Sequence, residues 1–333
     1  MVRDRLQDVL DELAALRKDP SSESSLAALR RVIVREASLA VARAARIVAE
    51  AQLTALAADL VAAFSRLLEA PAKKDPGCVA KQAIASALVR LEHDADGVFR
   101  AGIRHRQLEG VWGGQVDTAV ELRSTCGLGL ARSARADVPE LLAELLADPE
   151  PAARVSAARA IAAHGGMAAP PLLRHKALAG DEEPRVVVDC LVGLLQLDPA
   201  GGLSFVTGLL EPTPVAGQPP RDRSAQAVAA LGESRLKEAF PVLRDFHPRG
   251  WQRGRGDAVL RAMAALRRDE GFSFLLSLVR EADGPTARAA LAVLTDQQDA
   301  SLEARLREAA WGRGDLGREI GRERNRRETG GSS

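Results

Sequence analysis

A nine-residue pattern that recurs eight times along the chain constrains its fold more than any other feature of the sequence. Each copy ends in an aliphatic anchor, and seven of the eight copies carry a small residue four positions before that anchor. Because residues three to four apart share one face of a helix, each copy predicts a helix that a neighbouring helix can approach closely. The copies are residues 40–48, 80–88, 122–130, 153–161, 186–194, 223–231, 258–266 and 286–294.

A second amphipathic stretch follows most copies after a short polar turn. In these stretches, of which 138–146 and 272–280 are examples, the apolar residues stand at helical spacing. Pairing each copy with such a stretch predicts an all-α fold of about eighteen helices in nine antiparallel pairs.

Composition and charge argue against several further classes of fold and function. Aromatic residues make up only 3% of the chain and tyrosine is absent, so the side chains that β-sandwiches and barrels need are scarce. The 46 Lys and Arg nearly balance the 45 Asp and Glu, which argues against a protein that coats nucleic acid or membrane through bulk charge. The charged N-terminus, three Cys without a CxxC motif and the lack of a long apolar run predict a cytoplasmic protein without a membrane partner.

The copy at 153–161 reads Ala-Arg-Val-Ser-Ala-Ala-Arg-Ala-Ile. It resembles the second helix of the HEAT repeat family, including the HEAT-like repeats of bilin lyases, whose pattern is Val-Arg-x-x-Ala-Ala-x-Ala-Leu. Lys81 and Arg123 keep the basic residue at the second position of their copies, and Ala230-Leu231-Gly232 keeps the Ala-Leu-Gly ending. The last three copies depart from the pattern there, with Ser224, Val259 and Ala287. The resemblance covers roughly residues 38–310 and implies an α-solenoid (superhelix) whose patterned helices line the concave face.

Three segments follow from this organisation. Residues 1–37 lack the pattern and are expected to form N-terminal capping helices near 3–17 and 23–36. Residues 38–310 form the HEAT-like array, interrupted by a Pro-rich insertion at 211–223 that we expect to be extended. Residues 311–333 are charged and Gly-rich, and we expect a mostly disordered C-terminal tail.

The residues that could carry chemistry favour packing instead. Cys126 and Cys190 occupy the small-residue position of their copies, and Gly127 and Gly129 occupy close-packing positions of a patterned helix. No His spacing typical of a metal site occurs, so we expect no metal, cofactor or catalytic residue. An acidic stripe is interpreted as a solvated helix face: Asp137, Glu140, Glu144 and Asp148.

The function that we favour is a non-enzymatic scaffold that binds a protein partner through its concave face. The candidate contacts are basic residues on the patterned helices, although these side chains could equally bond to the carboxylates or carbonyls of a neighbouring repeat. They are Lys81, Arg123, Arg154, Arg159, Arg185 and Arg261.

Nucleic-acid binding is the alternative. A Gly-rich loop at 249–256 carries Arg249, Arg253 and Arg255 around Trp251. The surrounding region, 213–268, contains eleven basic and five acidic residues, a local positive charge that would attract a phosphate backbone. A second Gly-rich loop carries Trp112. We favour the interpretation that each of these Trp side chains is buried between adjacent repeats.

The third class is an enzyme of the HEAT-like bilin lyase or DNA glycosylase type. No motif of this sequence maps onto the site of either family, so no residues are carried over, and a shared fold alone is a weak argument for function.

Overall fold

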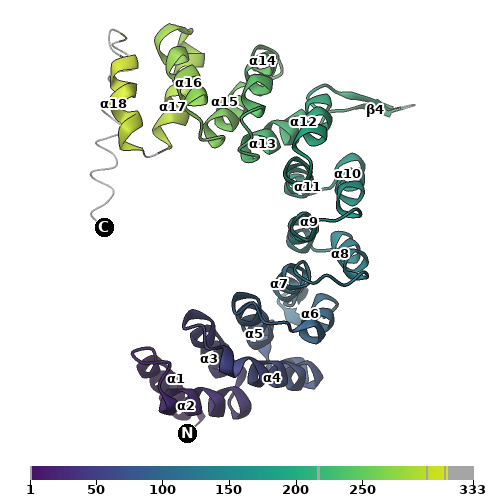
Figure 1. The fold of residues 1–333 in the computed structure, drawn as a ribbon, viewed down its shortest axis with the longest axis vertical. Coiled ribbons are helices and arrows are strands. Elements are labelled where there is room, and N and C mark those ends of the chain that lie inside the picture. The colour runs from purple at the N-terminus through teal and green to yellow at the C-terminus, as the bar shows by residue number, and fades with distance from the viewer. Residues whose placement is uncertain (1, 216–217, 298, 311–312, 314–333) are drawn as a thin grey trace. The chain divides into compact units, whose positions relative to one another are not determined.

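The computed structural model of the chain describes residues 2–215, 218–297, 299–310 and 313, and it divides into two units, 1–175 and 176–333. The described residues form eighteen α-helices and two short hairpins, so the predicted all-α class is confirmed (Figure 1). The expected tail at 311–333 lies outside the described residues except for Arg313. This guanidinium donates to three carbonyl oxygens at the end of α16, those of Val279, Arg280 and Ala282.

The first unit contains nine helices, three 3₁₀ turns and one hairpin, and α10 (Ala169–Ala179) crosses into the second unit. Its elements are α1 (Val2–Leu16), α2 (Glu23–Arg35), α3 (Ser38–Glu50), η1 (Thr54–Leu56), α4 (Ala57–Glu69), η2 (Ala72–Lys74), η3 (Pro76–Cys78), α5 (Val79–Arg90), α6 (Asp96–Ile103), β1 (Leu108–Val111), β2 (Gly114–Asp117), α7 (Val120–Leu130), α8 (Val138–Leu146) and α9 (Pro151–His164).

The second unit repeats the alternation of patterned and intervening helices. Its elements are α11 (Pro184–Leu197), α12 (Pro199–Gly208), β3 (Thr213–Val215), β4 (Gln218–Arg221), α13 (Ser224–Glu233), α14 (Ala239–Gln252), α15 (Gly256–Ala265), α16 (Asp269–Glu281), α17 (Gly284–Thr295) and α18 (Ala300–Ala309).

The eight copies of the pattern coincide with the odd-numbered helices from α3 to α17. Within the first unit α3, α5, α7 and α9 contact one another in succession, and α4, α6 and α8 lie in a second row (Figure 1). Within the second unit α11, α13, α15 and α17 do the same, with α12, α14 and α16 beside them. The core of each unit therefore lies between two rows of helices.

The small position and the anchor of the pattern form that core. Every small-position residue is at most 5% exposed and every anchor at most 6%. The backbone of Gly232 in α13 lies so close to Ala262 in α15 that a side chain at Gly232 would collide with the backbone of α15. Gly127 and Gly129 in α7 make the same kind of approach to Leu145 and Phe99, which confirms their predicted packing role. Small residues therefore set the distance between helices.

Helix starts and ends follow local signals. Pro151, Pro184 and Pro285 stand in the first turns of α9, α11 and α17, where a missing N–H costs nothing. The residue that turns the chain after several patterned helices is left-handed, with φ of 52–56° at Gln52, Glu92, Arg235 and Arg267. The turns that follow the patterned helices thus repeat a common geometry with different side chains.

Two hairpins interrupt the helices. β1 pairs antiparallel with β2, with Val111 opposite Gly114. The Pro-rich insertion, expected to be extended, contains β3 and β4, which form an antiparallel pair with a register shift between Thr213 and Val215. Residues 216 and 217 lie outside the described residues.

The small position of α11 gives the first prediction. Cys190 is fully buried, and burial raises the pKa of its thiol to about 12. Cys190→Leu adds bulk at a helix crossing and should lower the free energy of unfolding by about 1–3 kcal/mol, measured by urea denaturation. Cys190→Ala is the matched control and should cost less. Rapid modification of Cys190 in the native protein by a polar thiol reagent would contradict this placement.

Candidate functional site

Arg123 is the centre of a buried ion network in the first unit. Its side chain is 0% exposed, although it stands at the position proposed to contact a partner. Its Nη1 donates to Oδ2 of Asp117 at 2.7 Å and to the carbonyl oxygen of His105 at 3.0 Å. Its Nε donates to Oδ2 of Asp148 at 2.8 Å. The half-exposed Arg106 adds a second cation to both carboxylates. Arg123 therefore binds the chain's own carboxylates and cannot reach a partner.

The carboxylates of this network stand at a regular place in the sequence. Asp75 and Asp117 precede Lys81 and Arg123 by six residues, and Asp148 precedes Arg154 by the same number. Lys81 and Asp75 are both 1% exposed and form an ion pair with 3.2 Å between Nζ and Oδ2. Each aspartate also accepts backbone N–H groups near the start of the following helix, as Asp148 does from Glu150. At Asp75 and Asp117 the spacing therefore combines a bond to the start of the helix with an ion pair, whereas Arg154 donates to the backbone carbonyl of Asp148.

The protonation of the network follows from these bonds. Burial raises the pKa of Asp117, but hydrogen bonds from the N–H groups of Ala119 and Gln107 and from Arg123 outweigh it, and the pKa ends below its ordinary value. Burial likewise raises the pKa of Asp148, and hydrogen bonds from Arg123 and Arg106 bring it below its ordinary value. Both carboxylates are therefore charged at neutral pH.

The network holds the base of the β1–β2 hairpin against the start of α5. Nε2 of Gln107 donates to the carbonyl oxygen of Asp75 at 2.8 Å and to Oε1 of Glu109 at 2.6 Å. The same Glu109 oxygen accepts from Oγ1 of Thr118 at 2.9 Å and from the N–H of Gly77 at 2.8 Å. These bonds join the two strands of the hairpin to the turn before α5, so the hairpin is fixed at its base.

The tip of this hairpin is apolar and exposed. Trp112 and Gly113 form the two-residue connection, and Gly113 has the positive φ (92°) that such a tight turn requires. The Trp112 side chain is 104% exposed, which corrects the expectation that this Trp is buried between repeats. Three further apolar side chains of the hairpin are exposed as well: Leu108 at 60%, Val111 at 52% and Val116 at 45%. We call Trp112, Val111 and Val116 the apolar hairpin tip.

The remaining candidate contacts differ in how far their side chains are exposed. Nη1 of Arg154 donates to the carbonyl oxygens of Asp148 and Pro149, both at 2.8 Å. Arg185 binds Asp189 of its own helix and Glu233 at the end of α13. Arg123 and Arg185 thus bond to the next patterned unit, as the structural alternative supposed, whereas Lys81 and Arg154 bind the turn before their own helices. Arg159 and Arg261 have exposed side chains, on α9 and α15.

The segment at 249–256 is not the predicted loop. α14 continues through Pro248 to Gln252, and only a short turn separates it from α15. Arg249 and Arg253 pair with Glu211, and Nη2 of Arg255 lies 2.7 Å from Oδ2 of Asp222. The charges proposed for a phosphate backbone are thus bound within the unit.

Trp251 is half-buried in the same segment. Its Nε1 donates to Nε2 of His247 at 2.7 Å, and its ring lies on Gly256, which leaves no space for a side chain there. This Trp packs α14 against the start of α15.

The acidic stripe is solvated only in part. Asp137 and Glu144 accept hydrogen bonds from Arg100 and Arg104. Asp148, in contrast, is 3% exposed and belongs to the Arg123 network, so its assignment to a solvated face was wrong. The sequence signal that identifies it is its place six residues before a basic residue, which it shares with Asp75 and Asp117.

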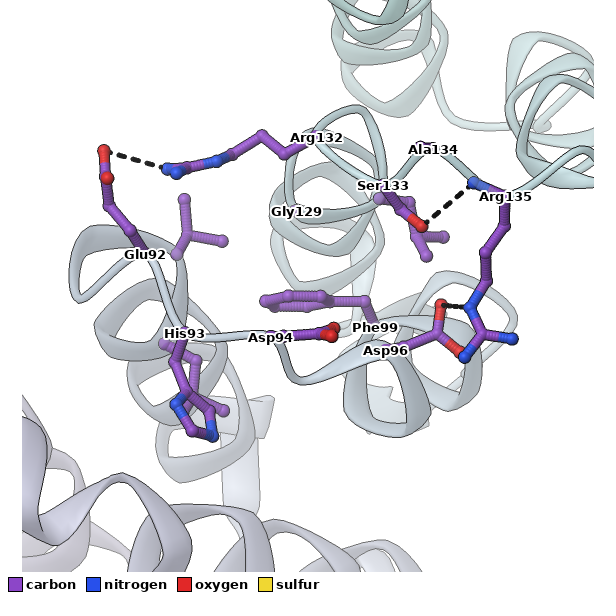
Figure 2. A pocket seen from close by; sticks show the side chains of 13 residues that line it. Glu92, His93, Asp94, Asp96, Phe99, Gly129, Arg132, Ser133, Ala134 and Arg135 are labelled. Atoms are coloured by element: carbon purple, nitrogen blue, oxygen red, sulfur yellow. Dashed lines mark hydrogen bonds and ion pairs between the residues drawn. The ribbon is translucent and has the colours of Figure 1, made fainter.

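A cavity of about 530 Å³ lies in the first unit where α5 and α7 end and α6 begins (Figure 2). Glu92 and Arg132 form an ion pair at one side with 3.1 Å between their charged atoms, and Arg135 lies 3.4 Å from Asp96 at the other. The ring of Phe99 lies between these pairs. Asp94 also lines the cavity, so three carboxylates stand against two arginines and the lining has one negative charge in excess.

Comparisons with known proteins do not identify a family for this chain. No family model matches the sequence, and no curated protein matches it significantly. Among the described helices, none is both long enough and apolar enough to cross a bilayer. Nor do the described residues bring three or more His, Cys, Asp or Glu side chains together in a metal-binding group.

The buried network gives the second prediction. Arg123→Met leaves Asp117 and Asp148 without their buried cation and should lower the free energy of unfolding by about 3–5 kcal/mol, measured by urea denaturation. Arg104→Met is the matched control, because the Arg104–Glu144 pair is exposed (61% and 57%), so its loss should change the free energy of unfolding far less. Equal losses in the two variants would contradict the assigned role of Arg123.

The same experiment has a defined pH dependence. The pKa values of Asp117 and Asp148 are lowered in the folded protein, so their stabilisation is complete above the ordinary aspartate pKa of about 3.9 and is lost as pH falls below it. The difference between wild type and Arg123→Met should therefore shrink below about pH 4. A difference that stays constant into acid would show that these carboxylates do not depend on Arg123.

Proposed function

We propose that the chain is an α-solenoid of the HEAT-like type that serves as a non-enzymatic scaffold and binds a protein partner. Support comes from the succession of patterned helices within each unit, where every such helix contacts the next. The aspartate six residues before a basic residue recurs in three copies, which is a second sign of repetition. Stacked helix pairs of this kind present extended surfaces to other proteins.

The observation that carries the proposal is the exposure of Trp112 on the apolar hairpin tip. Large apolar side chains that gather on a surface mark sites of interaction, and Trp is enriched among the residues that dominate binding energy at interfaces. Val111 and Val116 share one face of the hairpin and extend the apolar surface beside Trp112, whereas Leu108 is exposed on the other face near the base. A partner with an apolar cleft would bury this side chain.

The anchoring of the hairpin supports the same function. A binding loop that is already fixed loses less conformational entropy on association. Gln107 and Glu109 bind the strands to the turn before α5, and Asp117 at the end of β2 binds Arg123. In this proposal the buried Lys81 and Arg123 support the contact surface instead of forming it. Because Arg249, Arg253 and Arg255 are paired with carboxylates, nucleic-acid binding is the weaker proposal.

The solenoid proposal predicts an extended monomer. Nine helix pairs, each about 10 Å thick, stack to roughly 90 Å, and we expect a radius of gyration of about 25–30 Å from solution scattering. A compact globule of this length would give about 20 Å. A measured value near the globular figure would reject the solenoid while leaving the helices themselves in place.

The binding proposal predicts that Trp112 is required for partner capture. Affinity isolation from the native host should recover a protein with the wild-type chain and not with Trp112→Ser. The matched control is Met167→Ser, since Met167 is 97% exposed in the same unit outside the hairpin. With the purified partner, Trp112→Ser should weaken binding at least tenfold, or about 1.4 kcal/mol, by calorimetry.

Two results would reject this role. Capture of the same protein by wild type and Trp112→Ser would show that the hairpin is not the contact. Binding of the wild-type chain, but not Trp112→Ser, to neutral phosphatidylcholine vesicles would show that the hairpin meets lipid instead of protein.

A further inference from the structure

A cavity of about 480 Å³ in the second unit carries three arginines on its wall. Arg235 follows α13, Arg261 lies on α15 and Arg267 follows α15, and all three are exposed. Val293 of α17 and Ala265 add an apolar part to the lining. The wall is therefore built by three successive patterned helices and the turns behind them.

The positive charge of this wall is compensated only in part, because the acidic side chains of Glu233 and Asp296 line the cavity beside the three arginines. No ion pair joins Arg235, Arg261 or Arg267 to a carboxylate of the described chain at 4.0 Å or less. Glu233 also lines the cavity, but both of its carboxylate oxygens accept from Arg185, at 2.7 Å each. The acidic side chain nearest in sequence to Arg235 is thus already occupied.

In the first unit, the residues that follow two neighbouring patterned helices form an ion pair. Glu92 follows α5 with a φ of 54°, and Arg235 and Arg267 follow their helices with φ of 56° and 52°. Glu92 pairs with Arg132, which follows α7, and the charges cancel. In the second unit the residues after neighbouring helices are both arginine, so no such pair forms.

The dipole at helix C-termini accounts for the positions of only two of the three arginines. Arg235 and Arg267 stand beside helix C-termini, where cations are stabilised by the helix dipole. Arg261 lies one turn inside α15, where the dipole gives no comparable stabilisation. Its exposed guanidinium adds a third positive charge to a wall whose remaining carboxylate is that of Asp296, so a bound anion would reduce the repulsion among the three arginines.

We propose that this cavity binds an acidic peptide segment of a protein partner. A guanidinium matches the two oxygens of a carboxylate. Packed helices lie about 8–10 Å apart, and a peptide in the polyproline II conformation advances about 3.1 Å per residue with three residues per turn, so every third side chain lies on the same side. Carboxylates about three residues apart would therefore reach the arginines behind successive helices, while aliphatic atoms between them contact Val293. The inference rests on the proposed function in one respect, because it assumes that the peptide is a segment of a protein partner.

The test uses the full chain and a fluorescein-labelled peptide with glutamate at every third position of a Gly-Ser background. Fluorescence anisotropy should show binding that weakens as salt is raised through the physiological range. The same peptide with glutamine in place of glutamate should bind at least tenfold more weakly.

Arg261→Ala should weaken binding of the acidic peptide about tenfold, because a charge-assisted hydrogen bond is lost. Arg288→Ala is the matched control, since Arg288 is an exposed arginine of the same unit outside the cavity, and it should bind as wild type. Circular dichroism should show equal helix content in both variants. Arg261→Lys keeps the charge without the planar fork and should fall between them.

Three outcomes overturn the proposal: equal binding of the glutamate and glutamine peptides, equal effects of Arg261→Ala and Arg288→Ala, or tighter Arg261-dependent binding of inorganic tripolyphosphate than of the peptide. The last result would assign the cavity to a phosphate ligand. None of these measurements involves Trp112, so failure here leaves the hairpin proposal standing, and loss of Trp112-dependent capture leaves this one standing.

Discussion

The close approach of patterned helices is the constraint on which the rest of the structure depends. A small residue at one position and an aliphatic anchor four residues later allow α13 and α15 to meet with Gly232 against the backbone of Ala262. Such contacts leave no room for large side chains between helices, because interiors are packed at near-crystalline density. The scarcity of aromatic residues follows from the same geometry. Cys126 and Cys190 fit the position for their size, and burial raises the pKa of both thiols, so they act as packing residues.

A buried ion network completes the first unit in a way that packing alone does not. Isolated buried charges are costly, and the cost is offset only when carboxylate and guanidinium are fully hydrogen-bonded. Arg123 meets that condition through Asp117, Asp148 and a backbone carbonyl. Because Asp117 ends β2, the same bonds fix the hairpin that carries Trp112. Charged residues of a patterned helix and of the turns beside it thereby hold the hairpin, which lies outside the nine-residue pattern.

The sequence predicted the local features well and the long-range ones poorly. Helix positions, the buried small slot and the role of Gly127 followed from periodicity, which acts within a few residues. The exposure of Trp112 did not, because it depends on whether another element covers the hairpin. Pro248 and the glycines after it indicated a loop, yet α14 continues there, since Trp251 packs on Gly256 and Glu211 binds the arginines on the helix. Tertiary contacts overrode the local signal, as they do wherever propensity is weak. The partner of Arg123 was likewise missed because Asp148 lies beyond the next helix.

In the proposed solenoid, residues that take no part in packing between the patterned helices can differ from one helix to the next and so carry functional differences. In a repeat architecture each element contacts mainly its neighbours, so a change in one turn alters stability only locally. The residue after a patterned helix illustrates this freedom: it keeps the left-handed turn but is Gln52, Glu92, Arg235 or Arg267. Where Glu92 meets Arg132 the turns neutralise each other, and where two arginines take these places a cavity gains positive charge. The hairpin between α6 and α7 is a larger departure of the same kind. The buried positions of the pattern must stay alike for neighbouring helices to pack, so under the proposed function the specificity of binding resides in the departures from the pattern.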